Sequence, residues 1–407
     1  MLSQKTSLFF DVDEFENLLE YYNSKNSYSK ALEGSKNALN QHPNSATLLV
    51  SVAQLYLAIH KPQEALKFLN KAEAIEPYNI DLFYTKASIF SQLRKSDKAI
   101  ENYKKALQHA EEFEKEDILL QLAFEYENLD KHNDAIAYLK QILSLNIDNE
   151  TALYELGFCF DVSDQIEKGK KYFQAFVDKN PYSYIGWYNL GITNAKLDLF
   201  EKAIDCYDFA IAIKEDFSSA YFNKAHCFNQ QEKYEEALSC FNETLQFDTE
   251  DSLCYYYMGE SFEKLEDFEK AISFYKKAIS LDEYMADAWH GIASCYFELG
   301  RELDAISYVK KSIKLDEFNP EYHYLLGEAQ STLGFQSEAL ESFKKVYDLD
   351  PENETILIDL ANASKELNDN EEAMNYYILG VQNQSKNGKL LYNFVAFLLQ
   401  KGDLINT

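Results

Sequence analysis

Hydrophobic and small residues along the chain follow the spacing of helices. Within residues 184–217, the positions that share one face of a first helix are Trp187, Leu190, Gly191 and Asn194, and those that share one face of a second helix are Ala203, Tyr207 and Ala210. The pattern predicts two amphipathic helices joined by a short turn.

This two-helix pattern returns along the chain. A small residue of the second helix marks each repeat, at Ala31, Ala65, Ala99, Ala135, Gly169, Ala203, Ala237, Ala271, Ala305, Ala339 and Ala373. The interval is 34 residues throughout, except for 36 between Ala99 and Ala135, where we expect a longer loop near residues 108–117. A fixed period of this length predicts a solenoid, in which each repeat packs on its neighbours.

The domain organisation follows from this period. We expect an N-terminal extension over residues 1–11, a repeat array over 12–387, and the terminal helix of an incomplete repeat with a tail over 388–407. The repeats are expected to start near residues 12, 46, 80, 116, 150, 184, 218, 252, 286, 320 and 354. At the first of them, Asp11 and Glu14 have the spacing of a capping box that starts a helix.

Positions counted from the start of each repeat have a steric logic. Position 8 is Gly or Ala in most repeats, which predicts a close approach of two helices there. Aromatic residues at position 24 are expected to fill the space between repeats. Proline recurs at position 32, between one repeat and the next, and Gly300 and Gly334 fall in the turn between the two helices of a repeat.

These residues resemble the tetratricopeptide repeat family, whose W-x2-L-G…A-x3-Y-x2-A spacing appears in residues 184–217. The resemblance covers about residues 12–401. It implies an all-α fold: a right-handed α-solenoid of about eleven 34-residue helix-turn-helix repeats plus a C-terminal helix. It also implies that positions 2, 5, 9 and 12 of the first helices line a concave groove.

Composition and charge limit the classes of partner that we expect. The 407 residues carry 68 acidic and 39 basic side chains, a net charge of −29, which disfavours binding to nucleic acids and anionic membranes and favours basic partners. The longest apolar run, residues 390–399, is about half of the roughly 20 residues that a membrane span needs. Because no signal peptide is apparent either, we expect a cytoplasmic protein with free thiols and no membrane insertion.

Motifs for enzymatic chemistry are missing from the sequence. It contains no glycine-rich phosphate loop, no HExxH motif and no Cys/His metal spacing, so we expect no cofactor and no metal. The cysteines follow the repeat as well: Cys159, Cys227 and Cys295 all occupy position 10, which indicates a small packing slot.

One stretch offers a candidate catalytic triad. In "DAWHGIAS", Asp287, His290 and Ser294 share one helix face, as the parts of a nucleophilic site could. However, they are positions 2, 5 and 9 of their repeat. A serine within a helix also has no free backbone N–H nearby to form an oxyanion hole. Groove lining is therefore the favoured interpretation, and an enzyme is the less favoured alternative.

Position 5 is the most informative column of the predicted groove. It is occupied by Val50, Tyr84, Leu120, Tyr154, Tyr188, Phe222, Tyr256, His290, Tyr324, Ile358 and Tyr392. The candidate binding residues of the groove are Tyr84, Tyr154, Tyr188, Phe222, His226, Tyr256, Glu260, Glu263, Asp287, His290, Ser294, Tyr324 and Glu328. Aromatic faces with scattered carboxylates suit an extended peptide that carries Lys or Arg.

The favoured function is therefore a non-enzymatic scaffold or adaptor that binds a partner protein or an extended, basic peptide in this groove. A chaperone-type carboxylate clamp is not expected, because position 5 carries no Lys. The alternative is a structural protein that self-associates through residues 388–401, a helix that is apolar nearly all round. That helix either contacts another chain or belongs to a repeat that is cut short, and the pattern slightly favours the second.

Overall fold

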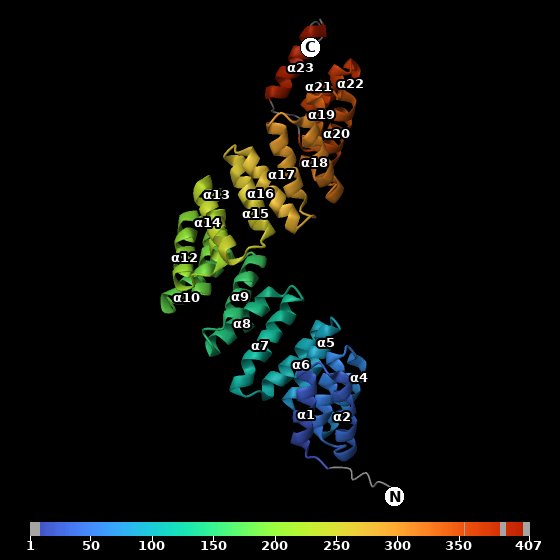
Figure 1. Ribbon diagram of the computed structural model, residues 1–407, viewed down its shortest axis with the longest axis vertical. Helices are drawn as coiled ribbons and strands as arrows, with labels where there is room; N and C mark the ends of the chain where they lie inside the picture. Colours follow the sequence, from blue (N-terminus) through green and yellow to red (C-terminus); the bar gives the residue numbers. More distant parts are fainter. Residues whose placement is uncertain (1–8, 354, 383–387, 402–407) are drawn as a thin grey trace. The chain divides into compact units, whose positions relative to one another are not determined.

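The computed structural model describes residues 9–353, 355–382 and 388–401, and within these residues every regular element is an α-helix (Figure 1). The all-α solenoid predicted from the 34-residue period is confirmed, since the helices follow one another in packed pairs. The chain forms two units, Met1–Leu199 and Phe200–Thr407.

The helices of the first unit are α1 Val12–Ser24, α2 Tyr28–Gln41, α3 Ala46–Ala58, α4 Pro62–Ile75, α5 Ile80–Gln92, α6 Ser96–His109, α7 Glu112–Glu127, α8 His132–Leu145, α9 Glu150–Val162, α10 Ile166–Lys179 and α11 Tyr184–Ala195. Those of the second unit are α12 Phe200–Ile213, α13 Ser218–Gln230, α14 Tyr234–Phe247, α15 Ser252–Lys264, α16 Phe268–Leu281, α17 Ala286–Glu298, α18 Glu302–Leu315, α19 Pro320–Thr332, α20 Gln336–Leu349, α21 Ile356–Glu366, α22 Asn370–Gln382 and α23 Gly388–Lys401. Odd-numbered helices are the first helices of the repeats.

The turn inside each repeat has one conformation. Gly300 and Gly334 lie in it as predicted, with φ of 67° and 80°. The equivalent residues of the other repeats also have positive φ although they are not glycine, and they are Asn26, His60, Arg94, Asp130, Asp164, Asp198, Glu232, Glu266 and Asn368. The left-handed residue lets the chain reverse and close the end of the first helix, as where Arg301 N donates to Tyr296 O at 2.9 Å.

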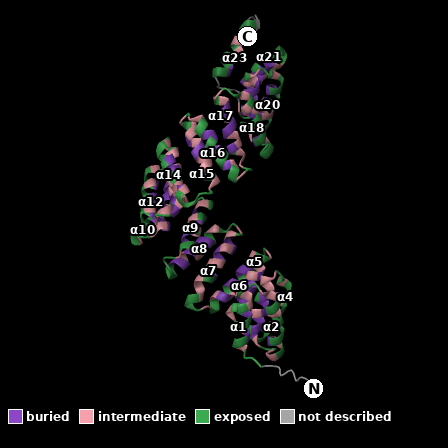
Figure 2. Cartoon of the chain, in the orientation of Figure 1, coloured by how far each residue is buried: buried purple, intermediate pink, exposed green. Residues whose placement is uncertain are grey.

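The core lies between the helices, where the marker residues of the sequence pattern are packed (Figure 2). The second-helix alanines, such as Ala271 and Ala305, are fully buried, and Tyr275 at position 24 is 2% exposed. The close approach predicted at position 8 is made to this aromatic side chain. A Cβ on Gly259 would lie 2.7 Å from the Tyr275 ring, and a Cβ on Gly291 of the next repeat would lie 2.5 Å from it.

The longer interval does not produce the longer loop that we expected near residues 108–117. Only Ala110 and Glu111 separate α6 from α7, and α7 has 16 residues where most first helices have 13. The Glu114 carboxylate accepts a hydrogen bond from Glu111 N at 2.8 Å, which caps the helix early. The two extra residues therefore extend a helix, because this acidic segment provides its own capping box.

The first and last helices of the described chain, α1 and α23, both belong to the packed array. The capping box predicted at the start of α1 is present, with Asp11 N donating to the Glu14 carboxylate at 2.9 Å. At the other end, α23 buries Leu390 and Phe397 against α21 and α22. Residues 1–8 and 402–407 of the predicted extension and tail lie outside the described residues.

Candidate partner-binding groove

The thirteen candidate residues all lie on first helices. They are Tyr84 on α5, Tyr154 on α9, Tyr188 on α11, Phe222 and His226 on α13, Tyr256, Glu260 and Glu263 on α15, Asp287, His290 and Ser294 on α17, and Tyr324 and Glu328 on α19. We call the surface formed by these positions the first-helix face. Each of the two units carries its own part of this face.

In the first unit, Tyr84 lines a hollow of about 260 Å³ together with Asp81, Glu114 and Asp117. Burial, together with the nearby Asp117 carboxylate of the next repeat, raises the pKa of Tyr84. The Tyr154 ring lies 6.1 Å from the Tyr188 ring, edge to face. The position-5 tyrosines of this unit are therefore partly exposed side chains of the first helices.

Two candidate residues of the second unit belong to an aromatic cluster. The His226 ring lies 4.7 Å from Phe222 and 4.1 Å from Tyr257, in edge-to-face contacts. Burial lowers the pKa of His226 to about 4, so this histidine is neutral at pH 7. His226 therefore supplies packing rather than charge to the first-helix face.

Glu263 is committed to contacts within the array. Its carboxylate accepts hydrogen bonds from the Tyr275 hydroxyl at 2.6 Å and from the Ser294 hydroxyl at 2.9 Å. It thus joins the second helix of its own repeat to the first helix of the next. Glu260, one helical turn earlier, makes no such bridge, and burial raises the pKa of its carboxyl.

The three members of the candidate triad have separate partners. Ser294 donates to Glu263, Asp287 accepts from the Tyr322 hydroxyl, and the His290 ring packs 5.0 Å from the Tyr322 ring. None of the hydrogen bonds found in the described ranges joins two of the three. Burial also lowers the pKa of His290, against the opposing effect of Glu263 and other nearby carboxylates. The geometry gives the hydrolase alternative no support.

A larger hollow, of about 560 Å³, brings part of the prediction together. Four candidate residues line it: His290, Ser294, Tyr324 and Glu328. The other lining residues were not among the candidates, and they are Phe297, Glu298, Pro320, Glu321, Leu325, Val346, Asp350, Asn353 and Thr355. We refer to it as the repeat 9–11 hollow.

The turn before α21 explains why sequence reasoning missed several of these residues. Asp350 and Asn353 occupy positions 31 and 34, which the repeat pattern marks only as the end of one helix and the start of the next. Their neighbours across the hollow come from α17 and α19. The sequence signal that could have identified Asp350 and Asn353 is that they are polar residues of the inter-repeat turn, and that such a turn lies close to position 5 of a first helix.

A small carboxylate network lies at the edge of this hollow. The Tyr324 hydroxyl lies near Asp359 on α21 and Glu328 on its own helix, and burial together with these two carboxylates raises the pKa of Tyr324. Burial raises the pKa of Glu328, and burial together with the neighbouring Glu328 raises the pKa of Asp359 to about 6. Two carboxyl groups close together in a partly dry site disfavour full ionisation of both.

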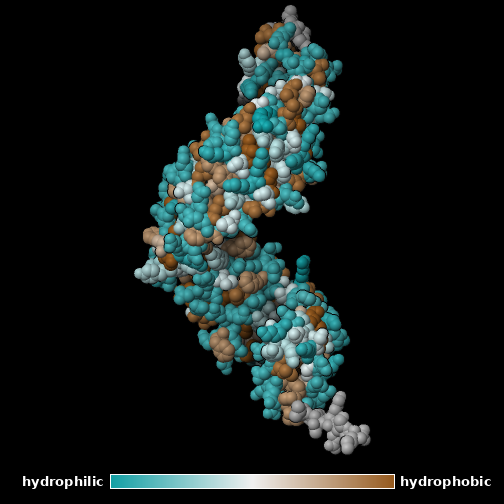
Figure 3. All heavy atoms as spheres, in the orientation of Figure 1, coloured by the Kyte–Doolittle hydropathy of each residue, from teal (hydrophilic) through white to brown (hydrophobic). Residues whose placement is uncertain are grey.

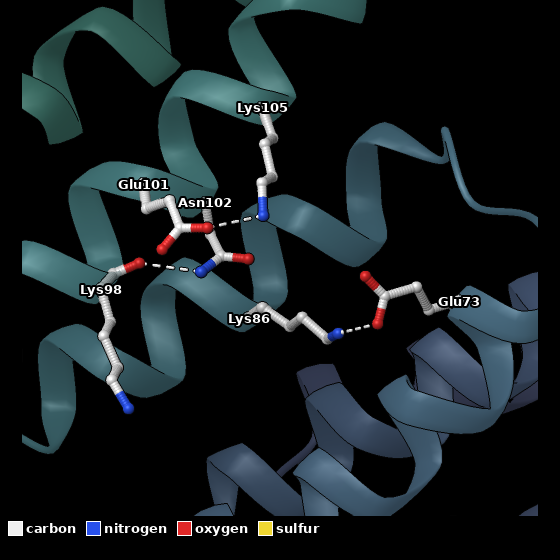
Figure 4. Close-up of polar contacts among 6 residues, drawn as sticks. All are labelled: Glu73, Lys86, Lys98, Glu101, Asn102 and Lys105. Carbon is white, nitrogen blue, oxygen red and sulfur yellow. Dashed lines mark hydrogen bonds and ion pairs between the residues drawn. The ribbon is translucent and has the colours of Figure 1, made fainter.

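The ion pairs found within the described residues involve none of the thirteen candidate residues. Lys86 of α5 reaches back to Glu73 of α4, and Lys105 pairs with Glu101 one turn earlier on α6 (Figure 4). Lys224 of α13 makes a contact like that of Lys86, with Asp208 of α12. On the face seen in Figure 3, hydrophilic side chains cover most of the surface and hydrophobic ones form small separate patches.

All six cysteines are free and buried, with burial raising the pKa of Cys227 to about 12. No group of three or more His, Cys, Asp or Glu side chains among the described residues is arranged to hold a metal ion. No helix within these ranges combines the length and the apolar character needed to cross a membrane.

Comparison with known proteins supports the resemblance to tetratricopeptide repeats. Profiles described as tetratricopeptide repeat match residues 80–112, 116–149, 151–183, 216–283, 264–329 and 320–353. The human protein O-mannosyl-transferase TMTC3 is 24% identical over 215 residues, which are 52% of this chain and 23% of that protein. The chain therefore spans about a quarter of the length of this curated relative.

Solved structures with similar helical arrays include the Cut9–Hcn1 hetero-tetramer of the APC/C, with 15% identity, a TM-score of 0.49, and coverage of 95% of this chain and 90% of that one. YrrB, described as a TPR protein with an unusual peptide-binding site, is 23% identical over 46% of this chain and 95% of its own, with a TM-score of 0.39.

The profile matches cover more than half of the chain. Repeats of this kind serve generally as scaffolds for protein interactions. The chain belongs to the tetratricopeptide repeat family.

Proposed function

We propose that the protein is a non-enzymatic scaffold that binds a partner protein or an extended peptide on its first-helix face. The observation that carries the proposal is the repeat 9–11 hollow, to which two first helices and the following inter-repeat turn contribute side chains. A site assembled from successive repeats suits a ligand that runs across helices, which is how solenoids use their extended surfaces.

The chemistry of the first-helix face indicates the kind of partner. Tyr256 and Tyr324 present rings there, and carboxylates such as Glu260 and Glu328 lie one turn further along the same helices. Aromatic faces and carboxylates together favour Lys and Arg side chains, through cation–π contacts and charge-assisted hydrogen bonds. The preferred partner is therefore a segment with basic residues.

The test is capture of partners by the full chain, with cross-linking and mass spectrometry to locate the contacts. Glu260→Lys combined with Glu328→Lys should weaken capture about tenfold or more, because like charges then face a basic partner. Glu263 is left unchanged, since Tyr275 and Ser294 depend on its carboxylate. The matched control is Glu338→Lys with Glu341→Lys, two exposed positions on the second helix α20.

Unchanged partners and unchanged cross-links in the first-helix double variant would refute the proposal. Circular dichroism must show the same helical signal in both double variants. Loss of binding in the control alone would place the partner on the second helices instead.

A second candidate function, self-association, is favoured by one face of α23. Leu391, Val395 and Leu399 follow one another at intervals of four and are 42%, 50% and 54% exposed. Val395→Glu should convert a concentration-dependent assembly into a monomer in light-scattering measurements at tens of micromolar. Phe397 is unsuitable for this purpose, because it is 3% exposed and packs against Tyr377 in the core. A wild-type chain that is already a strict monomer would remove this candidate.

A further inference from the structure

The repeat 9–11 hollow has a charge that the protein itself does not neutralise. Glu298, Glu321, Glu328 and Asp350 line it, and none of its lining residues is Lys or Arg. The ion pairs within the described ranges involve other carboxylates, such as those of Asp304 on α18 and Glu372 on α22. Four carboxyl groups around one hollow favour a cationic ligand.

The walls of the hollow are not polar throughout. Phe297 and Leu325 line it from α17 and α19, and Val346 lines it from α20. The Tyr324 ring is half-buried and packs 6.0 Å from the Phe343 ring of α20, so its orientation is set before any ligand arrives. An apolar wall with one fixed aromatic ring suits an aliphatic stem, while the carboxylates suit a charged tip.

The size of the hollow limits the ligand. Its volume of about 560 Å³ is large enough for a long side chain together with the adjoining backbone of an extended segment. Asn353 and the exposed Thr355 border it on the side of α21, where their side chains can meet the backbone of such a segment. A free inorganic cation would leave the apolar wall unused, and no metal-binding arrangement exists among the described residues.

We propose that the repeat 9–11 hollow is a specificity pocket that receives one Lys or Arg side chain of the bound segment. This inference rests on the proposed function and adds to it the residue that the partner must supply and the place where that residue binds. Glu298 and Glu321, the two exposed carboxylates, are the specificity-determining residues. Tyr324 is the aromatic face of the pocket.

The experiment begins with a displayed library of random seven-residue peptides, selected against the full chain. We expect the selected sequences to share one basic residue. In a synthetic peptide of that sequence, replacing the basic residue by Gln or Met should weaken binding to the wild-type chain about tenfold, measured by fluorescence anisotropy. The same replacement should cost less than about twofold on the Glu298→Gln/Glu321→Gln variant, because the two changes remove one interaction.

The double variant is conservative, since Gln has the shape of Glu and no side chain of the described residues donates a hydrogen bond to either carboxylate. Glu338→Gln with Glu341→Gln on α20 is the matched control, and it should retain the full tenfold effect. The dependence on salt is an independent measurement: a higher salt concentration should weaken binding of the basic peptide much more than binding of its neutral version.

The outcomes separate the two proposals. Selected peptides without a basic residue, or a peptide replacement that costs the same on the wild type and on the double variant, would overturn the pocket while leaving peptide binding in place. Failure of the full chain to select any peptide would overturn the proposed function, and the pocket with it.

Discussion

Asp359→Asn is expected to stabilise the second unit at neutral pH. Asp359 lies on α21 beside the repeat 9–11 hollow, and its pKa is raised from 3.8 to about 6, mainly by burial and then by the nearby Glu328. A carboxyl group with a raised pKa prefers its neutral form in the folded state, so ionisation opposes folding. The penalty is absent below pH 3.8, grows as the pH rises towards 6, and is constant above that value.

The shift sets the size of the effect. The difference between 3.8 and about 6 corresponds to about 3 kcal/mol, at about 1.4 kcal/mol for each pKa unit. Because the side chain is only partly buried, solvent screening reduces the expected gain to about 1–2 kcal/mol. Asn is close to Asp in shape and keeps a carbonyl oxygen near the Tyr324 hydroxyl, so packing should be preserved.

The measurement is urea unfolding followed by circular dichroism at pH 7 and pH 4. The gain should be present at pH 7 and should shrink below about 1 kcal/mol at pH 4, where the folded wild-type carboxyl is protonated. Asp348→Asn, an exposed position on α20, is the control and should change little at either pH. An equal gain at both pH values, or none at pH 7, would refute the reasoning. A gain at pH 7 would also mean that the array gives up stability to keep a carboxylate beside the hollow, as binding sites commonly do.

The backbone and packing features support further predictions. Gly300→Ala should destabilise its repeat by about 1 kcal/mol, because the position needs positive φ; a Cβ there would touch nothing, so no steric clash adds to this cost. Glu266→Gly should stabilise its own repeat by a similar amount, because Glu266 also has positive φ. Unchanged urea midpoints for both variants would contradict this reasoning. Gly259→Ala should cost about 1–3 kcal/mol in thermal unfolding, because the new Cβ would collide with the buried Tyr275 ring, and a variant as stable as wild type would show that the ring can move. A thiol reagent at pH 8 should react with Cys227 only in denaturant, and rapid reaction in the native state would contradict its burial.

Part of the candidate site was within reach of sequence reasoning. His290, Ser294, Tyr324 and Glu328 were expected on one face because positions 5 and 9 of a first helix are one turn apart, and they do line one hollow. The internal role of Glu263 was not predictable. It depends on the Tyr275 hydroxyl of the second helix and on Ser294 of the next repeat, two partners that a helical period does not bring together.

The longer interval between Ala99 and Ala135 shows the same limit. The interval of 36 residues indicates an insertion, but it does not determine whether the inserted residues form a loop or a helix. The capping contact between Glu111 and Glu114 decides for the helix. The acidic residues of this segment carry that signal, which is weak beside the strong signal of the repeat itself.

The repeat length, the helical pairs and the buried marker positions follow from the sequence alone, because each depends on contacts between residues three or four apart, or one repeat apart. The positive φ of the turn inside each repeat follows less directly from the sequence. Glycine indicates it at Gly300, whereas Glu266 and His60 adopt it although they are not glycine, through the packing of the helices on either side. Only the tertiary structure decides which polar groups of the first-helix face are used inside the array and which are left for a partner. That division depends on distances between side chains of different repeats, and those distances are set by how the helices pack.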